Sequence, residues 1–216
     1  MIILAPLIGY FIGSFQTSFI VGRFYGIDIR KHGSKNAGMT NVNRTLGKLP
    51  AFIVFVVDIL KAILAFVAVP FIIFDPAWSF ASWSHVYYEG FGYPNAVPGL
   101  LAGFGAILGH NFPYYLKFKG GKGIACTLGI ILMLDLRVAL ISFVIGFIIM
   151  LMYKYISLAS LAITLVTPLL LIFFGYDAAT VLLASLIGVL AWFMHRENIS
   201  RLLSGTERKF KFGKSE

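Results

Sequence analysis

The stretch Ala51-Phe-Ile-Val-Phe-Val-Val-Asp58-Ile-Leu-Lys61-Ala-Ile-Leu-Ala-Phe-Val-Ala-Val-Pro-Phe-Ile-Ile-Phe74 decides the fold class of this sequence. It is long enough to cross the hydrocarbon core of a bilayer, which takes roughly 20 apolar residues. Its two charges, Asp58 and Lys61, would each cost roughly 2.5 to 3.5 kcal/mol alone at the membrane centre. Because they lie three residues apart on one helical face, we expect them to face protein and neutralise each other or a third group. Both a structural ion pair and a functional site remain open.

The rest of the chain has the composition of a membrane protein. Of its 216 residues, 59% are hydrophobic, and the mean hydropathy is +0.87. This composition leaves too little polar surface for a soluble fold. We therefore expect an all-α integral membrane protein with about seven transmembrane helices, forming a single domain over residues 1–216. The expected spans are approximately 3–22, 51–74, 97–116, 123–134, 138–153, 156–174 and 178–194.

The positive charges predict the orientation of these spans. Every Lys and Arg except Lys61 and Arg137 falls in loops or a tail that seven spans place on one side of the membrane. The positive-inside rule makes that side cytoplasmic, with the N-terminus outside and the C-terminus cytoplasmic. The net charge is +9. Its segregation between apolar spans favours anionic lipid or a charged metabolite over nucleic acid as the partner.

The segment from Asp75 to Pro98 is the longest connection expected on the outer side. It contains no Lys or Arg and is rich in Trp, Tyr and Phe. Aromatic residues of this kind gather where a membrane meets water. The segment predicts an interfacial belt on the outer face, and a long flexible loop is the alternative.

The loop between the first two expected spans carries groups that suit an anion. Gly33 and Gly38 allow backbone N–H groups to converge, and the loop is poor in acidic residues. Side-chain donors are supplied by Ser34, Asn36, Thr40, Asn41 and Arg44. A phosphate or a developing oxyanion needs such donors. A basic solvated loop is the alternative.

A second loop, from Gly109 to Gly123, ends in a glycine-lysine sequence. Its last residues are Gly120, Gly121, Lys122 and Gly123, directly before an expected helix. Glycines let the chain approach an anion closely, and a helix N-terminus directs N–H groups and partial positive charge at it. The loop is not a Walker A motif, because Gly123 and Ile124 follow the lysine where Ser or Thr would hold magnesium. It predicts a phosphate site that requires no nucleotide, and a helix start near lipid phosphates is the alternative.

The tail begins with a histidine and an amide at helical spacing. His195, Asn198 and Arg201 share one face of an expected helix. This arrangement brings a titratable group and an amide to the membrane surface, near the other two segments.

Together, the three segments resemble the bacterial acyl-phosphate:glycerol-3-phosphate acyltransferase family (PlsY). The resemblance runs from about Gly13 to Lys209, nearly the whole chain. It rests on DIR-x2-GS-x-N-x-G-x-TN-x2-R at Asp28 to Arg44, GH-x2-P-x4-FKGGKG at Gly109 to Gly123, and HREN-x2-RLL-x-GTE at His195 to Glu207. Lys35 stands where the family often has Gly, and Gln16 where Pro is frequent.

The resemblance implies transfer of a fatty acyl group from acyl phosphate to the 1-hydroxyl of sn-glycerol 3-phosphate, giving lysophosphatidic acid, with no cofactor and no metal. It places the enzyme in the bacterial inner membrane with its active site on the cytoplasmic side. The residues with an implied catalytic role are Ser34, Arg44, His195 and Asn198. Implied substrate contacts are Lys35, Asn36, Thr40, Asn41, Gly120, Gly121, Lys122 and Gly123, of which the last four would bind the phosphate of glycerol 3-phosphate. Glu207 is implied to be structural.

The implied chemistry agrees with the inventory of residues. An acyl phosphate has a good leaving group, so the reaction needs a positioned hydroxyl and donors aimed at the carbonyl oxygen. The proton could pass to His195 or to a substrate phosphate oxygen. Cys126 lies inside an expected span and Ser34 has no evident paired base. We therefore expect direct attack without an acyl-enzyme.

Two other functions are alternatives. A transporter or channel for a phosphate-bearing anion would explain the basic loops. It predicts charged residues or broken helices near mid-membrane, whereas most of the polar residues singled out here lie on one face of the membrane. A thioester-dependent acyltransferase would need a His-x4-Asp pair, and no His in the sequence has Asp at that spacing. Whether a soluble enzyme that produces acyl phosphate docks on the basic face stays open.

Overall fold

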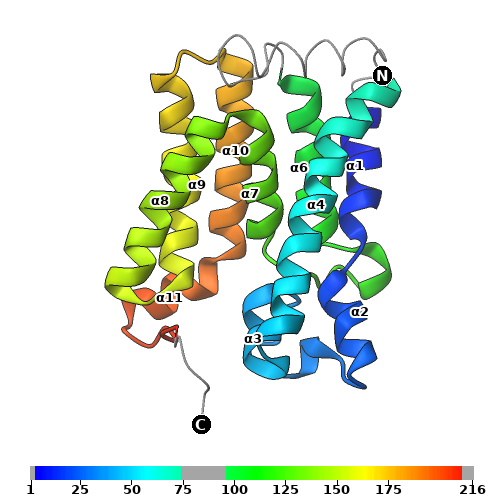
Figure 1. Ribbon diagram of the computed structural model, residues 1–216, viewed down its shortest axis with the longest axis vertical. Coiled ribbons are helices and arrows are strands. Elements are labelled where there is room, and N and C mark those ends of the chain that lie inside the picture. The colour runs from blue at the N-terminus through cyan, green and yellow to red at the C-terminus, as the bar shows by residue number, and fades with distance from the viewer. Residues whose placement is uncertain (1–2, 74–95, 211–216) are drawn as a thin grey trace.

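The computed structural model describes residues 3–73 and 96–210, which are helical over most of their length and contain no strand. Figure 1 shows the long helices side by side along the longest axis of the molecule. The apolar helices are α1 (Leu4–Ser14), α2 (Thr17–Phe24), α4 (Lys48–Ile73), α6 (Val97–Asn111), α7 (Ile124–Leu134), α8 (Leu136–Tyr153), α9 (Ile156–Phe173) and α10 (Ala178–Met194). Shorter elements are η1 (Ile29–Lys31), α3 (Met39–Leu46), η2 (Tyr114–Leu116) and α11 (Arg196–Leu203).

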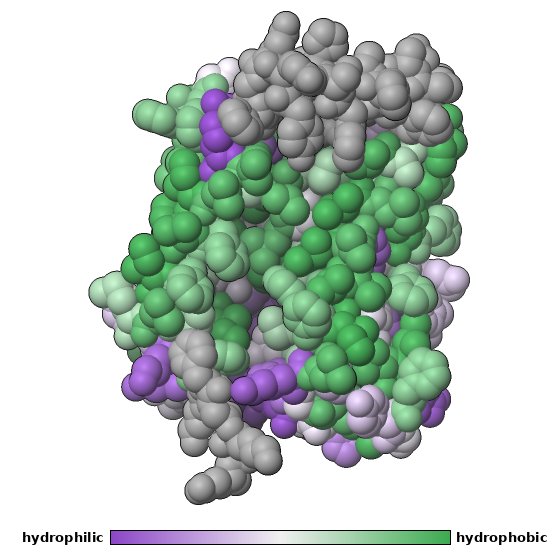
Figure 2. Space-filling view, in the orientation of Figure 1, coloured by the Kyte–Doolittle hydropathy of each residue, from purple (hydrophilic) through white to green (hydrophobic). Residues whose placement is uncertain are grey.

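The all-helical membrane fold is as expected, and its surface fits a bilayer. Exposed hydrophobic side chains such as Leu60, Phe143 and Leu169 cover the helices. Figure 2 shows a largely hydrophobic middle on one face, with hydrophilic residues along the lower end and a smaller group at the upper left. Figure 1 places α3 and α11 at this lower end.

Among the described residues, four helical segments are long and apolar enough to cross a membrane. They are Leu4–Phe24, Lys48–Pro70, Leu136–Tyr153 and Ile156–Phe173. The pair α10 and α11, bent by 62°, brings the number to as many as five. With 15 and 11 residues, α6 and α7 are shorter than a usual span. The number of seven spans and the orientation of the termini stay predictions.

The first expected span is broken in the structure. α1 ends at Ser14 and α2 begins at Thr17. The Tyr115 hydroxyl donates a hydrogen bond to Ser14 O at 2.9 Å and accepts one from the Gln16 N–H at 3.1 Å. The Gln16 side chain donates from Nε2 to His110 O at 2.5 Å. The break is therefore held by the segment that follows α6.

The first loop also differs from expectation, because it contains the helix α3. Thr40, Asn41 and Arg44 lie on this helix and not in turns. α3 is strongly amphipathic and buries Asn41 and Val42. Val42 packs in a small core with Ile29 and Val54, so the polar loop is anchored on α4.

Glycines allow α1 and α6 to pack backbone against backbone. A Cβ atom added at Gly13 would clash with Ala106 O, and one at Gly109 with Tyr10 O. Small residues permit this close approach between membrane helices. The contact brings the loop after α6 to the break between α1 and α2.

Most of the expected outer belt, Asp75 to Pro98, lies outside the described residues. Of that segment the structure describes Ala96, Val97 and Pro98, where α6 begins.

Candidate active site

The glycine-lysine loop joins the end of α6 to the start of α7. The Gly120 N–H donates to Asn111 O at 3.1 Å, and the Gly121 N–H donates to His110 O at 3.0 Å. These two hydrogen bonds to α6 were not predicted from the sequence. Gly123 then turns the chain with a φ of 78°, and no side chain caps α7. The first-turn N–H groups of α7 lack intrahelical partners and carry partial positive charge, which suits an anion.

Lys122 connects this loop with the tail. Its half-buried ammonium group donates a hydrogen bond to Asn198 Oδ1. Burial, with the charges of Arg201 and Arg44, lowers the pKa of Lys122 to about 8, although Glu207 and Glu197 act in the opposite direction. The group is therefore mainly protonated at neutral pH and can attract a phosphate.

Glu207 holds the tail together. Its carboxylate accepts hydrogen bonds from Ser157 Oγ at 2.9 Å, Asn198 Nδ2 at 2.7 Å and Arg201 Nε at 2.7 Å. Burial raises the pKa of Glu207, but these hydrogen bonds outweigh it and hold the pKa below the usual range. Because the amide nitrogen of Asn198 faces Glu207, its oxygen faces Lys122.

His195 lies buried where α10 gives way to α11. Its Nδ1 atom is 2.8 Å from Ala191 O. A carbonyl oxygen only accepts, so Nδ1 carries the proton and Nε2 keeps its lone pair. Burial and the charge of Lys122 lower the pKa of His195 to about 4. The imidazole is thus neutral at pH 7, with one nitrogen able to accept a hydrogen bond.

In the first segment, Asn41 shapes the loop. Its Oδ1 atom accepts from the Ser34 N–H at 2.7 Å, and Nδ2 donates to Ile29 O and His32 O, both at 3.0 Å. These protein partners occupy both ends of the amide. Lys35 follows with a φ of 59°, in the left-handed region that favours glycine, which is the residue common there in the family it resembles.

The first segment meets the other two at the lower end. A Cβ atom added at Gly121 would lie 2.8 Å from Ala37 O, so the first loop lies against the glycine-lysine loop. Arg44 is close to the tail: loss of hydration and the charges of Arg208 and Arg201 lower its pKa, while Glu207 raises it. The structure thus brings Arg44, Lys122, His195, Asn198 and Glu207 into one region. Within the described part of the chain, no hydrogen bond joins Ser34, Lys35, Asn36 or Thr40 to the other two segments.

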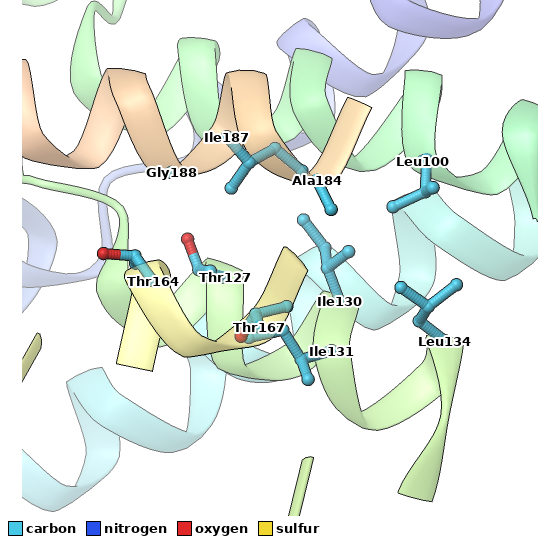
Figure 3. A pocket seen from close by; sticks show the side chains of 10 residues that line it. All are labelled: Leu100, Thr127, Ile130, Ile131, Leu134, Thr164, Thr167, Ala184, Ile187 and Gly188. Atoms are coloured by element: carbon cyan, nitrogen blue, oxygen red, sulfur yellow. The ribbon is translucent and has the colours of Figure 1, made fainter. Parts of the chain in front are cut away.

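An apolar pocket lies inside the bundle next to this region. Figure 3 shows its lining, which α6, α7, α9 and α10 supply. The residues are Leu100, Thr127, Ile130, Ile131, Leu134, Thr164, Thr167, Ala184, Ile187 and Gly188. The Thr164 and Thr167 hydroxyls donate to carbonyl oxygens within α9, and the Thr127 hydroxyl donates to Gly123 O just before α7, which leaves the walls apolar. Thr127 lies one helical turn from Gly123, and Gly188 about two turns from His195.

Sequence reasoning missed two parts of this region. Ser157, which binds Glu207, lies far from any motif and gave no signal. His110 lies in the second motif, and its contacts with Lys61 and Gly121 were not foreseen. Within residues 3–73 and 96–210, no three His, Cys, Asp or Glu side chains are grouped to hold a metal ion.

Comparisons with known proteins agree over nearly the whole chain. A family model described as glycerol-3-phosphate acyltransferase matches residues 3–205. The glycerol-3-phosphate acyltransferase of Alkaliphilus metalliredigens is 40% identical over 96% of this chain and 95% of its own length. That of Staphylococcus aureus is 37% identical over 98% of this chain and 99% of its own length.

Two solved structures share the fold. A crystal structure of PlsY (YgiH), an integral membrane glycerol 3-phosphate acyltransferase, in the glycerol 3-phosphate form, has a TM-score of 0.82. It is 33% identical, covering 97% of this chain and 96% of that one. The lysophosphatidic acid form gives a TM-score of 0.80 at 33% identity, covering 97% and 95% of the two chains. Because relatives, family model and fold agree from end to end, this chain belongs to the glycerol-3-phosphate acyltransferase family.

Proposed function

We propose that the protein transfers a fatty acyl group from acyl phosphate to the 1-hydroxyl of sn-glycerol 3-phosphate, giving lysophosphatidic acid and phosphate. The reaction takes place on the cytoplasmic side of a bacterial inner membrane. The observation that supports it best is the meeting of Lys122, Arg44 and the start of α7 beside a neutral His195. Two phosphate-bearing substrates need such a concentration of positive charge.

Glycerol 3-phosphate binds through its phosphate at the start of α7. Lys122 supplies a full charge there, and the helix end supplies N–H groups. Arg44 comes from a different segment, so it suits the phosphate of the second substrate, where a guanidinium can bind two oxygens at once. Ser34, Lys35, Asn36 and Thr40, on the first segment, complete that side of the site.

The reaction then needs a hydroxyl held against the acyl carbon. The hydroxyl oxygen attacks the carbonyl carbon, the bond between that carbon and the bridging oxygen breaks, and phosphate leaves with the bonding electrons. His195 Nε2 accepts a hydrogen bond from the hydroxyl and orients it. Because the pKa of His195 is held to about 4, the hydroxyl proton passes to a phosphate oxygen, whose second pKa is about 6.

The hydrocarbon chain of the donor stays out of water among the apolar helices, while its phosphate remains with the charged groups.

One assay tests the donor. The purified protein is given glycerol 3-phosphate with either palmitoyl phosphate or palmitoyl-CoA, and lysophosphatidic acid is measured. We expect product only with palmitoyl phosphate. Turnover only with the thioester would overturn the proposed donor.

A second experiment tests direct attack. The protein is incubated with labelled palmitoyl phosphate and no glycerol 3-phosphate, then denatured and examined for covalent label. We expect none. A labelled ester on Ser34 would show an acyl-enzyme and overturn this mechanism.

A further inference from the structure

A buried polar network lies beneath the glycine-lysine loop. It consists of Asp58 and Lys61 on α4 and His110 near the end of α6. Their exposed fractions are 2%, 6% and 3%. Buried ion pairs contribute little net stability, because the loss of hydration offsets much of their attraction. The proposed reaction does not use any of the three residues directly, so another role has to account for them.

Lys61 binds three different parts of the structure. Its Nζ atom lies 2.8 Å from Asp58 Oδ1, 2.7 Å from Phe15 O and 2.9 Å from His110 Nδ1. An ammonium group has three protons and no lone pair, so these contacts use all of its donors. His110 Nδ1 also lies 3.6 Å from Asp58 Oδ1, so both members of the ion pair contact the ring. The network fixes the position of the His110 ring.

Phe15 O is available to Lys61 because α1 ends there. Asp58 is held in turn by Thr17, the first residue of α2, whose hydroxyl donates to Asp58 Oδ1 at 3.1 Å. The residues on both sides of the break between α1 and α2 therefore form hydrogen bonds with the network.

His110 in turn positions the glycine-lysine loop. Its carbonyl oxygen accepts the Gly121 N–H at 3.0 Å and Gln16 Nε2 at 2.5 Å. Its ring lies so close to Gly121 that a Cβ atom added there would clash with Nε2. Gly121 directly precedes Lys122, so a movement of the ring displaces the lysine.

We propose that Asp58 and Lys61 are positioning residues for glycerol 3-phosphate, which act through His110 on Gly121 and Lys122. This inference rests on the proposed binding of that phosphate by the glycine-lysine loop. A misplacement of about 1 Å caused by a mutation far from the reacting atoms can cost about 10²-fold in rate, which shows how closely substrate-positioning groups must be held. The network does not touch His195 or Asn198, so its loss affects binding of this substrate before it affects chemistry.

The test compares three variants in detergent-purified protein. The double variant Asp58→Asn/Lys61→Met removes both charges together and leaves no unpaired ion. His110→Gln keeps an acceptor for Lys61 but withdraws the ring from Gly121. Asp135→Asn is the matched control: Asp135 is also buried and bound by a cation, Arg137, but it lies at the opposite end of α7.

For the double variant and for His110→Gln we expect the KM for glycerol 3-phosphate to rise about tenfold. The KM for acyl phosphate and the kcat at saturating glycerol 3-phosphate should stay within about twofold. Asp135→Asn should lower the unfolding temperature and leave both KM values unchanged.

An unchanged KM for glycerol 3-phosphate in a folded double variant overturns the inference, as does a fall in kcat alone. If the double variant does not fold, His110→Gln decides by the same criteria. Lys122→Met is measured alongside. If it raises the KM for glycerol 3-phosphate and the network variants do not, the inference alone fails; if it leaves that KM unchanged, the proposed phosphate site fails.

Discussion

The ammonium group of Lys122 donates a hydrogen bond to Asn198 Oδ1, which joins the glycine-lysine loop to the tail. Glu207 holds the nitrogen of the same amide at 2.7 Å. The second and third motifs are therefore in direct contact. The lysine proposed to bind phosphate lies beside the segment that carries His195.

Replacing Lys122 by Met should chiefly weaken binding of glycerol 3-phosphate. A hydrogen bond to a charged group contributes about 1.5 to 3 kcal/mol, so the KM for this substrate should rise roughly 10- to 100-fold. Steady-state kinetics with acyl phosphate as donor measure the effect. Lys209→Met, which removes an exposed charge from the same basic end, is the control. An equal rise in this KM in both variants would mean that the charges attract the substrate only through their combined electric field.

The pH dependence of kcat/KM for glycerol 3-phosphate should report the protonation of Lys122. Its pKa is lowered to about 8, and only the protonated form attracts phosphate. The kcat/KM should therefore fall as the pH rises through about 8. In Lys122→Arg, this fall should disappear up to at least about pH 10, because a guanidinium stays protonated. A profile that is the same in both proteins contradicts the assignment, and Lys119→Arg, at an exposed lysine, serves as the control.

Removing the carboxylate of Glu207 should destabilise the folded protein. Glu207→Ala leaves Ser157, Asn198 and Arg201 without their shared acceptor. Loss of hydrogen bonds to a charged, partly buried group costs about 3 kcal/mol, and the unfolding temperature in detergent should fall accordingly. Glu197→Ala should have little effect, because Glu197 is exposed and lies 3.9 Å from Arg201. A similar fall in the unfolding temperature of both variants would contradict the proposed structural role of Glu207.

His195 should make stability depend on pH in mildly acidic solution. Its pKa is about 4 in the folded protein, against a usual value of 6.5. Between these values the unfolded chain binds a proton that the folded chain does not, so stability falls as the pH decreases from 6.5 to 4. The contribution reaches at most about 3 kcal/mol. Unfolding measured across this window should have a smaller pH slope in His195→Gln and an unchanged slope in His32→Gln. An unaltered slope in His195→Gln would show that the imidazole is not held neutral.

Much of the fold follows from local sequence. Apolar stretches of nearly bilayer length predict a helical membrane protein, because backbone N–H and C=O groups inside lipid must form their hydrogen bonds within their own segment. The helices α4, α6, α7, α8, α9 and α10 each lie within an expected span or overlap it closely. The break at Phe15 and Gln16 was not predicted, since it depends on Tyr115 and Lys61, which are distant in sequence.

The sequence by itself determined the membrane as solvent, the order of the helices and the three motifs that identify the family. These properties depend on composition and on neighbours along the chain. Only the tertiary structure decided that the Asn41 amide forms hydrogen bonds within its own loop and that the Gly120 and Gly121 N–H groups donate to α6. It also decided that Asp58 and Lys61 contact the glycine-lysine loop through His110. Each of these contacts joins segments or groups whose pairing depends on how the helices pack, which a single sequence does not record.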